Sequence, residues 1–381
     1  MAIYLDHAAT SPLRPEVLDA MLPYLREHHG NPSSIHASGR RARQGLDEAR
    51  EEIASLIGAK PREIVFTSGG TEADNLALKG VAWAASAKGR HIVTSAVEHK
   101  AVMSTAAILE RHGFEVTRVG VDRHGRVEPA AVVEAITEHT ILVSVMAANN
   151  EVGTTQPLVE IGALCRERRI PFHTDAVQSA AFSPPAADDW QANLVSLSAH
   201  KLGGPKGIGA LWVRQGTNLL PQMQGGAQER QRRAGTENVA GAVGFAVAMR
   251  LAYAEAPDTV LRDRLVEGVV ALPGVELTGH PVERLPNSAS FVIDGIEGGD
   301  LVAALDLDGI EASTGSACTT GSVEPSHVLL AMGIDERLAH GSLRLTLGPE
   351  TTAEEIERTI DVVTACIARL RASATPVAVS A

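Results

Sequence analysis

The stretch that decides the fold begins with IPFHTDAVQSA at residues 170–180 and ends with NLVSLSAHKLGGPKGIG at residues 193–209. Each piece holds a short β-rich run, and the runs lead to Asp175 and to Lys201. The glycines after Lys201 let the backbone approach a ligand closely. Ligands bind where the strands of an α/β sheet end, so we expect Asp175 and Lys201 to share one crevice.

Seven β-rich runs alternate with longer helical segments between residues 63 and 214. This alternation predicts an α/β fold whose large domain has a mostly parallel seven-stranded sheet, covered on both faces. The runs are EIVFTS (63–68), HIVTSA (91–96), FEVTRV (114–119), TILVSVMA (140–147), IPFHTDA (170–176), NLVSLS (193–198) and IGALWVR (208–214).

The part of the chain after Pro257 has a different texture, with consecutive β-runs that lack full crossovers. Such a pattern is typical of a smaller α+β domain. We expect a large domain over residues 15–256 and a small domain made of residues 1–14 and 257–381. A capping box at Thr352 and Glu355 predicts the start of the terminal helix.

Charge and cysteine content exclude several classes of function. The 46 acidic and 34 basic residues give a net charge of -12, which disfavours nucleic acid and anionic membranes as partners. The N-terminus lacks a signal-peptide pattern and no apolar stretch is long enough to span a bilayer, so we expect a cytoplasmic protein. Three widely spaced cysteines suit neither a disulfide framework nor a cysteine metal site.

An acid and a lysine at one crevice are the groups that a pyridoxal phosphate enzyme needs. The lysine forms a Schiff base with the cofactor's aldehyde, and the carboxylate pairs with the protonated ring nitrogen. Taken singly, Asp175 is also compatible with a helix cap, and Lys201 with a solvated loop residue. The hypothesis therefore depends on further residues at the same strand ends.

A phosphate site is the first of these. SGGTEADN at residues 68–75 joins the first β-run to a helix, where glycines and free N–H groups favour an anion. An ordinary helix start, capped by Thr71 with Asp74 three positions later, explains the same residues.

Four other polar groups follow strand ends or lie near them. His99 suits stacking on a flat ring or proton transfer, but also suits a helix start. Asn149 and Asn150 offer amide groups to a ligand or form a turn, and Gln178 would face the same pocket as Asp175. No side-chain cluster predicts a metal site.

Two arginine-containing segments add candidates for binding anions. Arg233 and Thr236 lie in a glycine-rich, locally basic loop that suits either an anion site or a solvated surface. Arg344, in SLRLTLG, is a candidate partner for a substrate carboxylate, and an interdomain ion pair is the alternative.

Cys318 lies in a segment of unusual composition. Eight of the ten residues from Ser313 to Ser322 are Ser, Thr or Gly, which predicts a mobile loop and an exposed thiol. Because thiolate nucleophiles need access, a chemical role is favoured over an incidental free thiol.

Nine motifs in this order resemble the cysteine desulfurases of the NifS/IscS group. They are YLDHAAT, FTSGGTEADNLALKG, EHKAV, ANNEVGTTQP, HTDAVQS, SAHKLGGPKGIGAL, RAGTENV, STGSACTTGSVEPSHVL and SLRLTLG, and they span residues 4 to 348. The resemblance implies the pyridoxal phosphate-dependent transferase fold type I (class V). It also implies a pyridoxal 5'-phosphate cofactor, a homodimer with sites at the subunit interface, and conversion of L-cysteine to L-alanine with transfer of the sulfur.

The resemblance also implies a role for each matching residue. Lys201 would carry the cofactor, Asp175 would pair with its ring nitrogen, and His99 would stack on the ring. Cys318 would accept the sulfur as a persulfide, and it could transiently contact an iron–sulfur cluster. Gln178 would contact the ring oxygen, and Asn150 would contact both cofactor and substrate. Arg344 would bind the substrate carboxylate. The phosphate would be held by Gly70, Thr71, Ser198, His200 and, from the other subunit, Thr236.

The sequence departs from the family pattern at two places, one that concerns packing and one that concerns a partner. Gly203 stands where the family usually has His or Tyr, which we expect to loosen packing. The tail is short, which puts docking to an iron–sulfur scaffold in doubt; a tRNA-thiolation protein is another possible acceptor. A selenocysteine lyase or class V aminotransferase of the same fold is the nearest alternative function, and a non-catalytic scaffold is the alternative from another class.

Overall fold

The structure is a computed structural model that describes residues 2–255, 259–315 and 324–374. Its largest sheet has seven strands in the order β2-β8-β7-β6-β5-β3-β4. β8 is antiparallel to both of its neighbours, and the pairs from β7 to β4 are all parallel. The strands are β2 (Ile64–Thr67), β3 (His91–Ser95), β4 (Glu115–Val119), β5 (Thr140–Ser144), β6 (Phe172–Asp175), β7 (Leu194–Ser198) and β8 (Gly209–Val213).

All seven predicted strands are therefore confirmed, as is the mostly parallel sheet. In several of these strands successive residues enter two different buried clusters, because successive side chains point to opposite faces. In β5, for example, Leu142 packs with α3 and α4, whereas Val143 packs on the opposite face.

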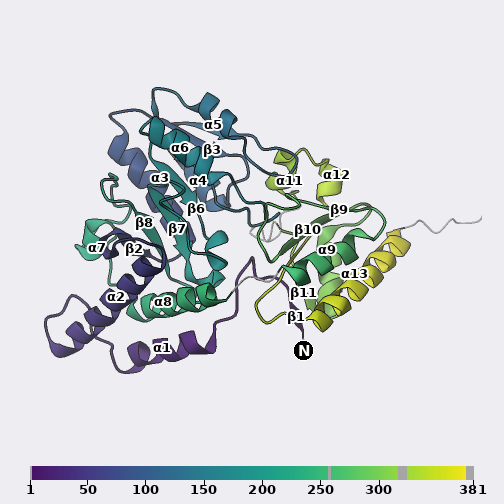
Figure 1. Ribbon diagram of the computed structural model, residues 1–381, viewed down its shortest axis with the longest axis horizontal. Coiled ribbons are helices and arrows are strands. Elements are labelled where there is room, and N and C mark those ends of the chain that lie inside the picture. The colour runs from purple at the N-terminus through teal and green to yellow at the C-terminus, as the bar shows by residue number, and fades with distance from the viewer. Residues whose placement is uncertain (1, 256–258, 316–323, 375–381) are drawn as a thin grey trace, which may run out of the picture.

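Helices cover both faces of this sheet (Figure 1). One face carries α3 (Gly70–Ala85) and α4 (Lys100–Arg111), which contribute Leu76, Leu78 and Leu109 to the core. The other face is covered by α1 (Pro15–Arg26), α2 (Ala37–Leu56), α5 (Pro129–Ala135), α6 (Leu158–Glu167) and α8 (Val239–Ala254).

The C-terminal elements form a separate layer beside the large sheet, drawn in green to yellow in Figure 1. An antiparallel sheet in the order β12-β10-β9 packs against helices. Its elements are α9 (Val260–Val270), β9 (Val275–Leu277), β10 (Ser288–Ile293), α10 (Gly298–Leu307), β11 (Ile310–Glu311), α11 (His327–Ala331), α12 (Glu336–Ala339), β12 (Ser342–Thr346) and α13 (Ala353–Ala374). The predicted capping box of α13 is confirmed by reciprocal bonds between Thr352 and Glu355.

The N-terminal segment joins this C-terminal layer rather than the large sheet. β1 (Ile3–Tyr4) pairs in parallel with β11, and Ile3 and Leu5 lie in the buried cluster of the C-terminal layer. These contacts support our proposal that residues 1–14 and 257–381 form one small domain and residues 15–256 the large domain.

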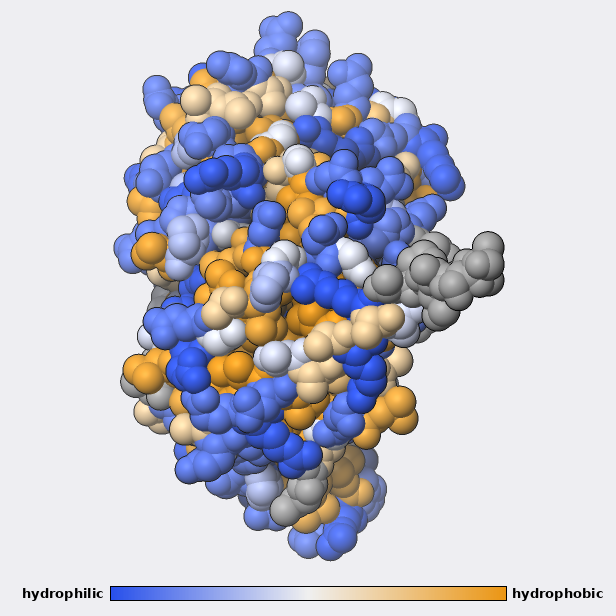
Figure 2. All heavy atoms as spheres, turned by 90° about the vertical axis from the view of Figure 1, so that its right-hand side faces the viewer, coloured by the Kyte–Doolittle hydropathy of each residue, from blue (hydrophilic) through white to orange (hydrophobic). Residues whose placement is uncertain are grey.

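The surface on the C-terminal side mixes polar and apolar residues. Figure 2 shows apolar residues gathered near the middle of this face, with hydrophilic residues around them. Within the described part of the chain, no helix combines the length and the apolar character that crossing a bilayer requires.

Replacing Leu5 with Ala tests the packing of the N-terminal segment. Leu5 has no exposed surface, so the variant should lower the free energy of unfolding by about 2–5 kcal/mol. Denaturant unfolding measures the change. Leu13→Ala is the control, because Leu13 is 39% exposed and its loss should cost less than about 1 kcal/mol. Equal effects of the two variants would contradict the buried placement of Leu5.

Candidate active site

The carboxyl ends of five strands meet at one edge of the large sheet, because the strands that carry them all run in the same direction. The predicted site residues follow these ends. They are Gly70 and Thr71 after β2, His99 after β3, Asn150 after β5, Asp175 and Gln178 at and after β6, and Ser198, His200 and Lys201 at and after β7.

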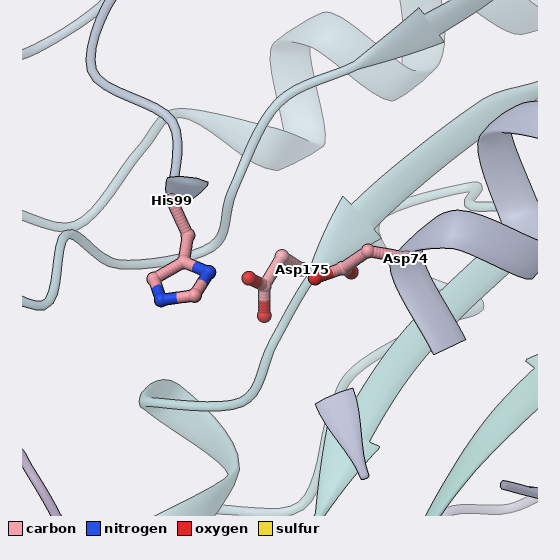
Figure 3. Close-up of side chains that lie close together, drawn as sticks. All are labelled: Asp74, His99 and Asp175. Carbon is pink, nitrogen blue, oxygen red and sulfur yellow. The ribbon is translucent and has the colours of Figure 1, made fainter. Parts of the chain in front are cut away.

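Asp175 lies at the end of β6, and its carboxyl group faces His99 and Asp74 (Figure 3). One ligand atom from each of these three side chains lies within 4.8 Å of the other two. The backbone N–H of Val177 donates to Asp175 Oδ1 at 2.9 Å. Burial raises the pKa of Asp175, and the neighbouring His99 ring, the backbone N–H of Val177 and the ammonium group of Lys201 act against that rise. Asp175 is therefore a buried acid whose charge needs a cationic partner.

His99 is both the first residue before α4 and a wall of the site. Its Nδ1 accepts a hydrogen bond from the backbone N–H of Ala101 at 3.1 Å, which caps the helix. Nδ1 therefore carries no proton, and a neutral ring has its proton on Nε2. The ring points toward Asp175 in Figure 3, so the helix-start and site roles are compatible.

Lys201 lies at the end of a short 3-10 helix (Ala199–Lys201) after β7, and its ammonium group contacts the N-terminal segment. Nζ donates to the carbonyls of Ala8 and Ala9, the latter at 2.7 Å. Gln178 Nε2 donates to the same Ala8 carbonyl at 2.9 Å. Lys201 is thus half-buried and held beside Gln178, which contradicts the alternative of a solvated loop residue.

His200 points toward the same N-terminal segment. Its Nδ1 lies 3.1 Å from the hydroxyl of Thr10, and Ser11 donates to its carbonyl at 2.7 Å. Burial, with the charges of Lys201 and Lys206, lowers the pKa of His200 to about 4. His200 is therefore a neutral ring at physiological pH.

The turn before α3 has the features of a phosphate cradle. Gly69 has a φ of 151°, which favours glycine, and no side chain caps the helix among the described residues. A Cβ on Gly70 would lie 2.6 Å from Val177 Cγ2, and one on Gly69 would lie 3.8 Å from Ser198 Oγ. The free N–H groups of the first helical turn, with the Ser198 hydroxyl close by, fit the phosphate of the implied cofactor.

The ordinary helix start considered for residues 68–75 is wrong. The helix begins at Gly70 with Gly69 as its N-cap, so Thr71 lies inside the first turn. Asp74 points instead into the protein, toward Asp175.

Arg344 lies on β12 and reaches across to the large domain. Its Nη1 donates to the carbonyl of Asn150 at 2.9 Å, and its Nη2 forms an ion pair with Asp6 Oδ1 at 2.7 Å. The guanidinium is buried, and its Nε has no hydrogen-bond partner within the described part of the chain. The structure thus brings Arg344 and Asn150 together, whereas the ion pair with Asp6 lies within the proposed small domain and is not the interdomain pair considered as the alternative.

Two predicted residues are not placed against this set. Thr236 is exposed, in the segment where Arg233 pairs with Glu72 of α3 at 2.8 Å. Cys318 lies outside the described residues. The described residues that flank its segment include Ser313, which pairs with Arg344, and Ser326, which donates to Glu151 beside Asn150.

Sequence reasoning missed three buried polar residues beside Asp175. Asp74, Glu98 and His173 are each 1% exposed or less. The Glu98 Oε1 accepts from Ser95 Oγ at 2.6 Å and from Met146 N at 2.9 Å, and burial raises its pKa to about 8. Burial lowers the pKa of His173 to about 3. The sequence signals were weak: Glu98 directly precedes His99, His173 precedes Asp175 by two residues, and Asp74 lies one helical turn after the glycines.

A separate cavity of about 850 Å³ lies at the opposite edge of the sheet, where β5, β6 and β7 begin. Lys88, Arg166, Arg169 and Arg214 line it. The first three follow or end α3 and α6, where cations complement the negative ends of helix dipoles. Helix dipoles therefore account for the first three charges, and Arg214 pairs with Asp188 at 2.7 Å. The cavity lies at the other end of the strands from the candidate site.

The chain matches the family described as Aminotransferase class-V over residues 3–359. It is 49% identical over 375 residues to "Cysteine desulfurase IscS" of Methanosarcina thermophila, covering 97% of this chain and 93% of that protein. It is 50% identical over 375 residues to "Cysteine desulfurase IscS" of Dictyoglomus turgidum, covering 97% and 95%.

Solved structures give the same picture. A protein described as "NIFS-LIKE PROTEIN" is 37% identical, with a TM-score of 0.91, and the match covers 97% of this chain and 100% of that one. "SspA in complex with cysteine" is 35% identical, with a TM-score of 0.82 and coverage of 92% and 100%. The fold type expected from the motifs is therefore confirmed.

Replacing Glu98 with Gln tests the buried acid. The folded pKa of about 8 exceeds the ordinary value of 4.5, so the folded protein holds a proton that the unfolded chain releases. The free energy of unfolding of the wild type should therefore fall as pH rises through this range. Glu98→Gln lacks this fall and should become the more stable protein by a few kcal/mol near pH 8, on the order expected from such a shift.

Urea unfolding at several pH values measures this difference. The control is Glu138→Gln, because the Glu138 side chain is 88% exposed and its removal should leave the pH dependence unchanged. Parallel stability curves for the wild type and Glu98→Gln would contradict a neutral Glu98.

Proposed function

This chain belongs to the class-V aminotransferase family and is a pyridoxal phosphate-dependent cysteine desulfurase, and on that premise we propose how its residues divide the work. The reaction converts L-cysteine to L-alanine and leaves the sulfur as an enzyme persulfide. One observation carries the assignment of the site: the buried Asp175 carboxylate faces His99 while Lys201 reaches the same sheet edge from the neighbouring strand. Pyridoxal phosphate supplies an aldehyde that holds amines and a ring that accepts electrons.

Each contact with the cofactor falls to a residue at this edge. Lys201 would hold the aldehyde, Asp175 would pair with the ring nitrogen, and His99 would stack on the ring. Gln178 would bond the ring oxygen, which would free the Ala8 carbonyl it now contacts. The residues that would hold the phosphate are Gly70, Thr71, Ser198, His200 and, from a second copy of the chain, Thr236.

The substrate contacts fall to Arg344 and Asn150. Arg344 would bind the L-cysteine carboxylate, and its Nη2 already forms an ion pair with Asp6. The substrate carboxylate would therefore replace or share the contact with Asp6, since both groups are anionic acceptors. The freed amine of Lys201 would then take the α-proton.

Sulfur transfer falls to Cys318. Its thiolate would attack the substrate sulfur, so the S–S bond of a persulfide forms as the Cβ–S bond breaks. The electron pair of the broken bond stays on carbon, which takes up a proton and becomes the methyl group of alanine. The overall change is cysteine plus enzyme thiol to alanine plus enzyme persulfide, which balances in atoms and electrons.

We infer a cytoplasmic homodimer that passes sulfur to an acceptor protein, such as an iron–sulfur scaffold. The exposed position of Thr236 supports its reaching a second subunit, and Arg233 anchors that segment at α3. The net charge of -12 argues against nucleic acid and anionic membrane as partners.

Incubation of the purified protein with L-cysteine and a reductant tests the activity. We expect sulfide and alanine in equal amounts, from a yellow protein. Lys201→Ala should lose the colour and the products together, because no other described lysine lies at this strand end. Lys206→Ala, at an exposed lysine five residues later, is the control and should keep both. A colourless wild type would favour a non-catalytic scaffold.

Cys318→Ser separates desulfuration from transamination. We expect turnover to fall by at least about a hundredfold, as for the loss of a nucleophile, while the yellow colour remains. Cys165→Ala is the control, because Cys165 is buried in α6 with a pKa raised to about 12 and should keep its activity. Unchanged alanine formation in Cys318→Ser would favour an aminotransferase. Parallel assays with selenocysteine separate a selenocysteine lyase.

A further inference from the structure

Asp74 has an unusual environment for an acid. It lies on α3 with 1% of its surface exposed, and its Oδ1 accepts no hydrogen bond from any described residue. Figure 3 shows its carboxyl group directed toward Asp175, on the side away from His99. Two buried carboxyl groups therefore meet behind the group that would face the cofactor ring.

The neighbouring histidine does not neutralise Asp74. His173 Nε2 approaches Asp74 Oδ1 at 3.6 Å, which is short enough for an ion pair if the ring is protonated. However, the ring nitrogens are engaged with hydroxyl groups, Nδ1 with Ser144 at 2.8 Å and Nε2 with Ser196 at 3.0 Å. The ring is fully buried, and burial lowers its pKa to about 3. His173 is therefore neutral, and Asp74 has no cation beside it from this strand.

Only one of the two carboxyl groups can keep its charge, because buried acids in contact cannot both ionise. Asp175 receives the N–H of Val177 and lies near His99 and Lys201, all of which favour its charged form. Burial and the charge of Asp175 raise the pKa of Asp74 well above the ordinary value of an aspartate. The proton of the pair therefore belongs on Asp74.

We propose that Asp74 is a positioning residue which, as a neutral carboxylic acid, donates a hydrogen bond to Asp175 and keeps the negative charge of the pair on Asp175. This inference rests on the proposed function, in which Asp175 faces the ring nitrogen. A donor behind Asp175 fixes the orientation of its carboxylate. It also lowers the basicity of Asp175, so the shared proton stays on the ring nitrogen, where it helps the ring accept electrons.

Two substitutions at residue 74 give opposite expectations. Asn has nearly the shape of Asp and a permanent N–H donor, so Asp74→Asn should imitate the neutral acid. Asp74→Ala removes the donor. Thr174→Val is the control, because Thr174 precedes Asp175 on β6, is fully buried, and has a hydroxyl without a described partner.

The experiment titrates each cofactor-free protein with pyridoxal phosphate and follows the absorbance of the bound form as a function of pH. Asp74→Asn and Thr174→Val should bind the cofactor within about threefold of the wild type, with the same pH profile. Asp74→Ala should bind the cofactor on the order of tenfold more weakly, the usual loss for a hydrogen bond to a charged group. The absorbance of its bound cofactor should also follow a different pH profile from that of the wild type. Thermal unfolding of the cofactor-free proteins shows whether each variant folds.

Each outcome decides the proposal. Equal losses in Asp74→Asn and Asp74→Ala would overturn it, since a charged Asp74 or a metal ligand cannot be imitated by Asn. An Asp74→Ala protein indistinguishable from the wild type would overturn it too. If Asp74→Ala does not fold, wild-type binding by Asp74→Asn supports the proposal and weakened binding overturns it. A wild type that takes up no cofactor would overturn the proposed function, and this inference with it.

Discussion

The parallel pairing of β5, β6 and β7 is the constraint on which the site depends. It places the ends of successive strands side by side, with Asp175 opposite Ser196 in the register of β6 and β7. The residues that follow these ends then meet at one edge without long loops. The same packing removes water from Asp74, Glu98 and Asp175, so the pKa of each of these acids is raised. One arrangement of strands thus produces both the geometry and the electrostatics of the site.

The N-terminal segment is the second element that the site needs. β1 adds a strand to the small domain, while the carbonyls of Ala8 and Ala9 receive Lys201. Asp6, between these two contacts, pairs with Arg344 of β12. A segment of a few residues therefore connects the lysine of the large domain to the arginine of the small domain. Movement of the small domain would therefore shift the carbonyls of Ala8 and Ala9 that bind Lys201.

The sequence was sufficient to predict the strands and most of the residues at the site, and for a physical reason. Buried parallel strands are short, apolar and bounded by glycine or polar residues, and each of these features is local in the sequence. The positions of Asp175 and Lys201 follow directly from the strand ends. The family motifs then added roles, such as that of Cys318, which residue chemistry alone left open.

The missed residues depend on neighbours that are distant in the sequence. Nothing local distinguishes Asp74 from a solvated helix residue, because its burial comes from β6 and β7, about a hundred residues later. The local sequence also does not predict the ion pair of Asp6, since its partner Arg344 lies near the other end of the chain. The sequence leaves Arg344 open to binding a substrate carboxylate or to forming an ion pair, and only the fold shows that its ion-pair partner is Asp6 in the N-terminal segment.

A buried ion pair extends this argument to the segment that carries Thr236. Glu229, Arg230 and Gln231 have φ values of 45°, 57° and 63°, a left-handed conformation that costs about 1–2 kcal/mol per residue without glycine. The carboxylate of Glu229 accepts two hydrogen bonds from the buried guanidinium of Arg50 and one from the backbone N–H of Phe66 on β2. Charge-assisted bonds of this kind offset the strain. The turn leads to Arg233, which pairs with Glu72 in the first turn of α3. The strained backbone therefore lies next to the segment that carries Thr236 and helps to fix its orientation.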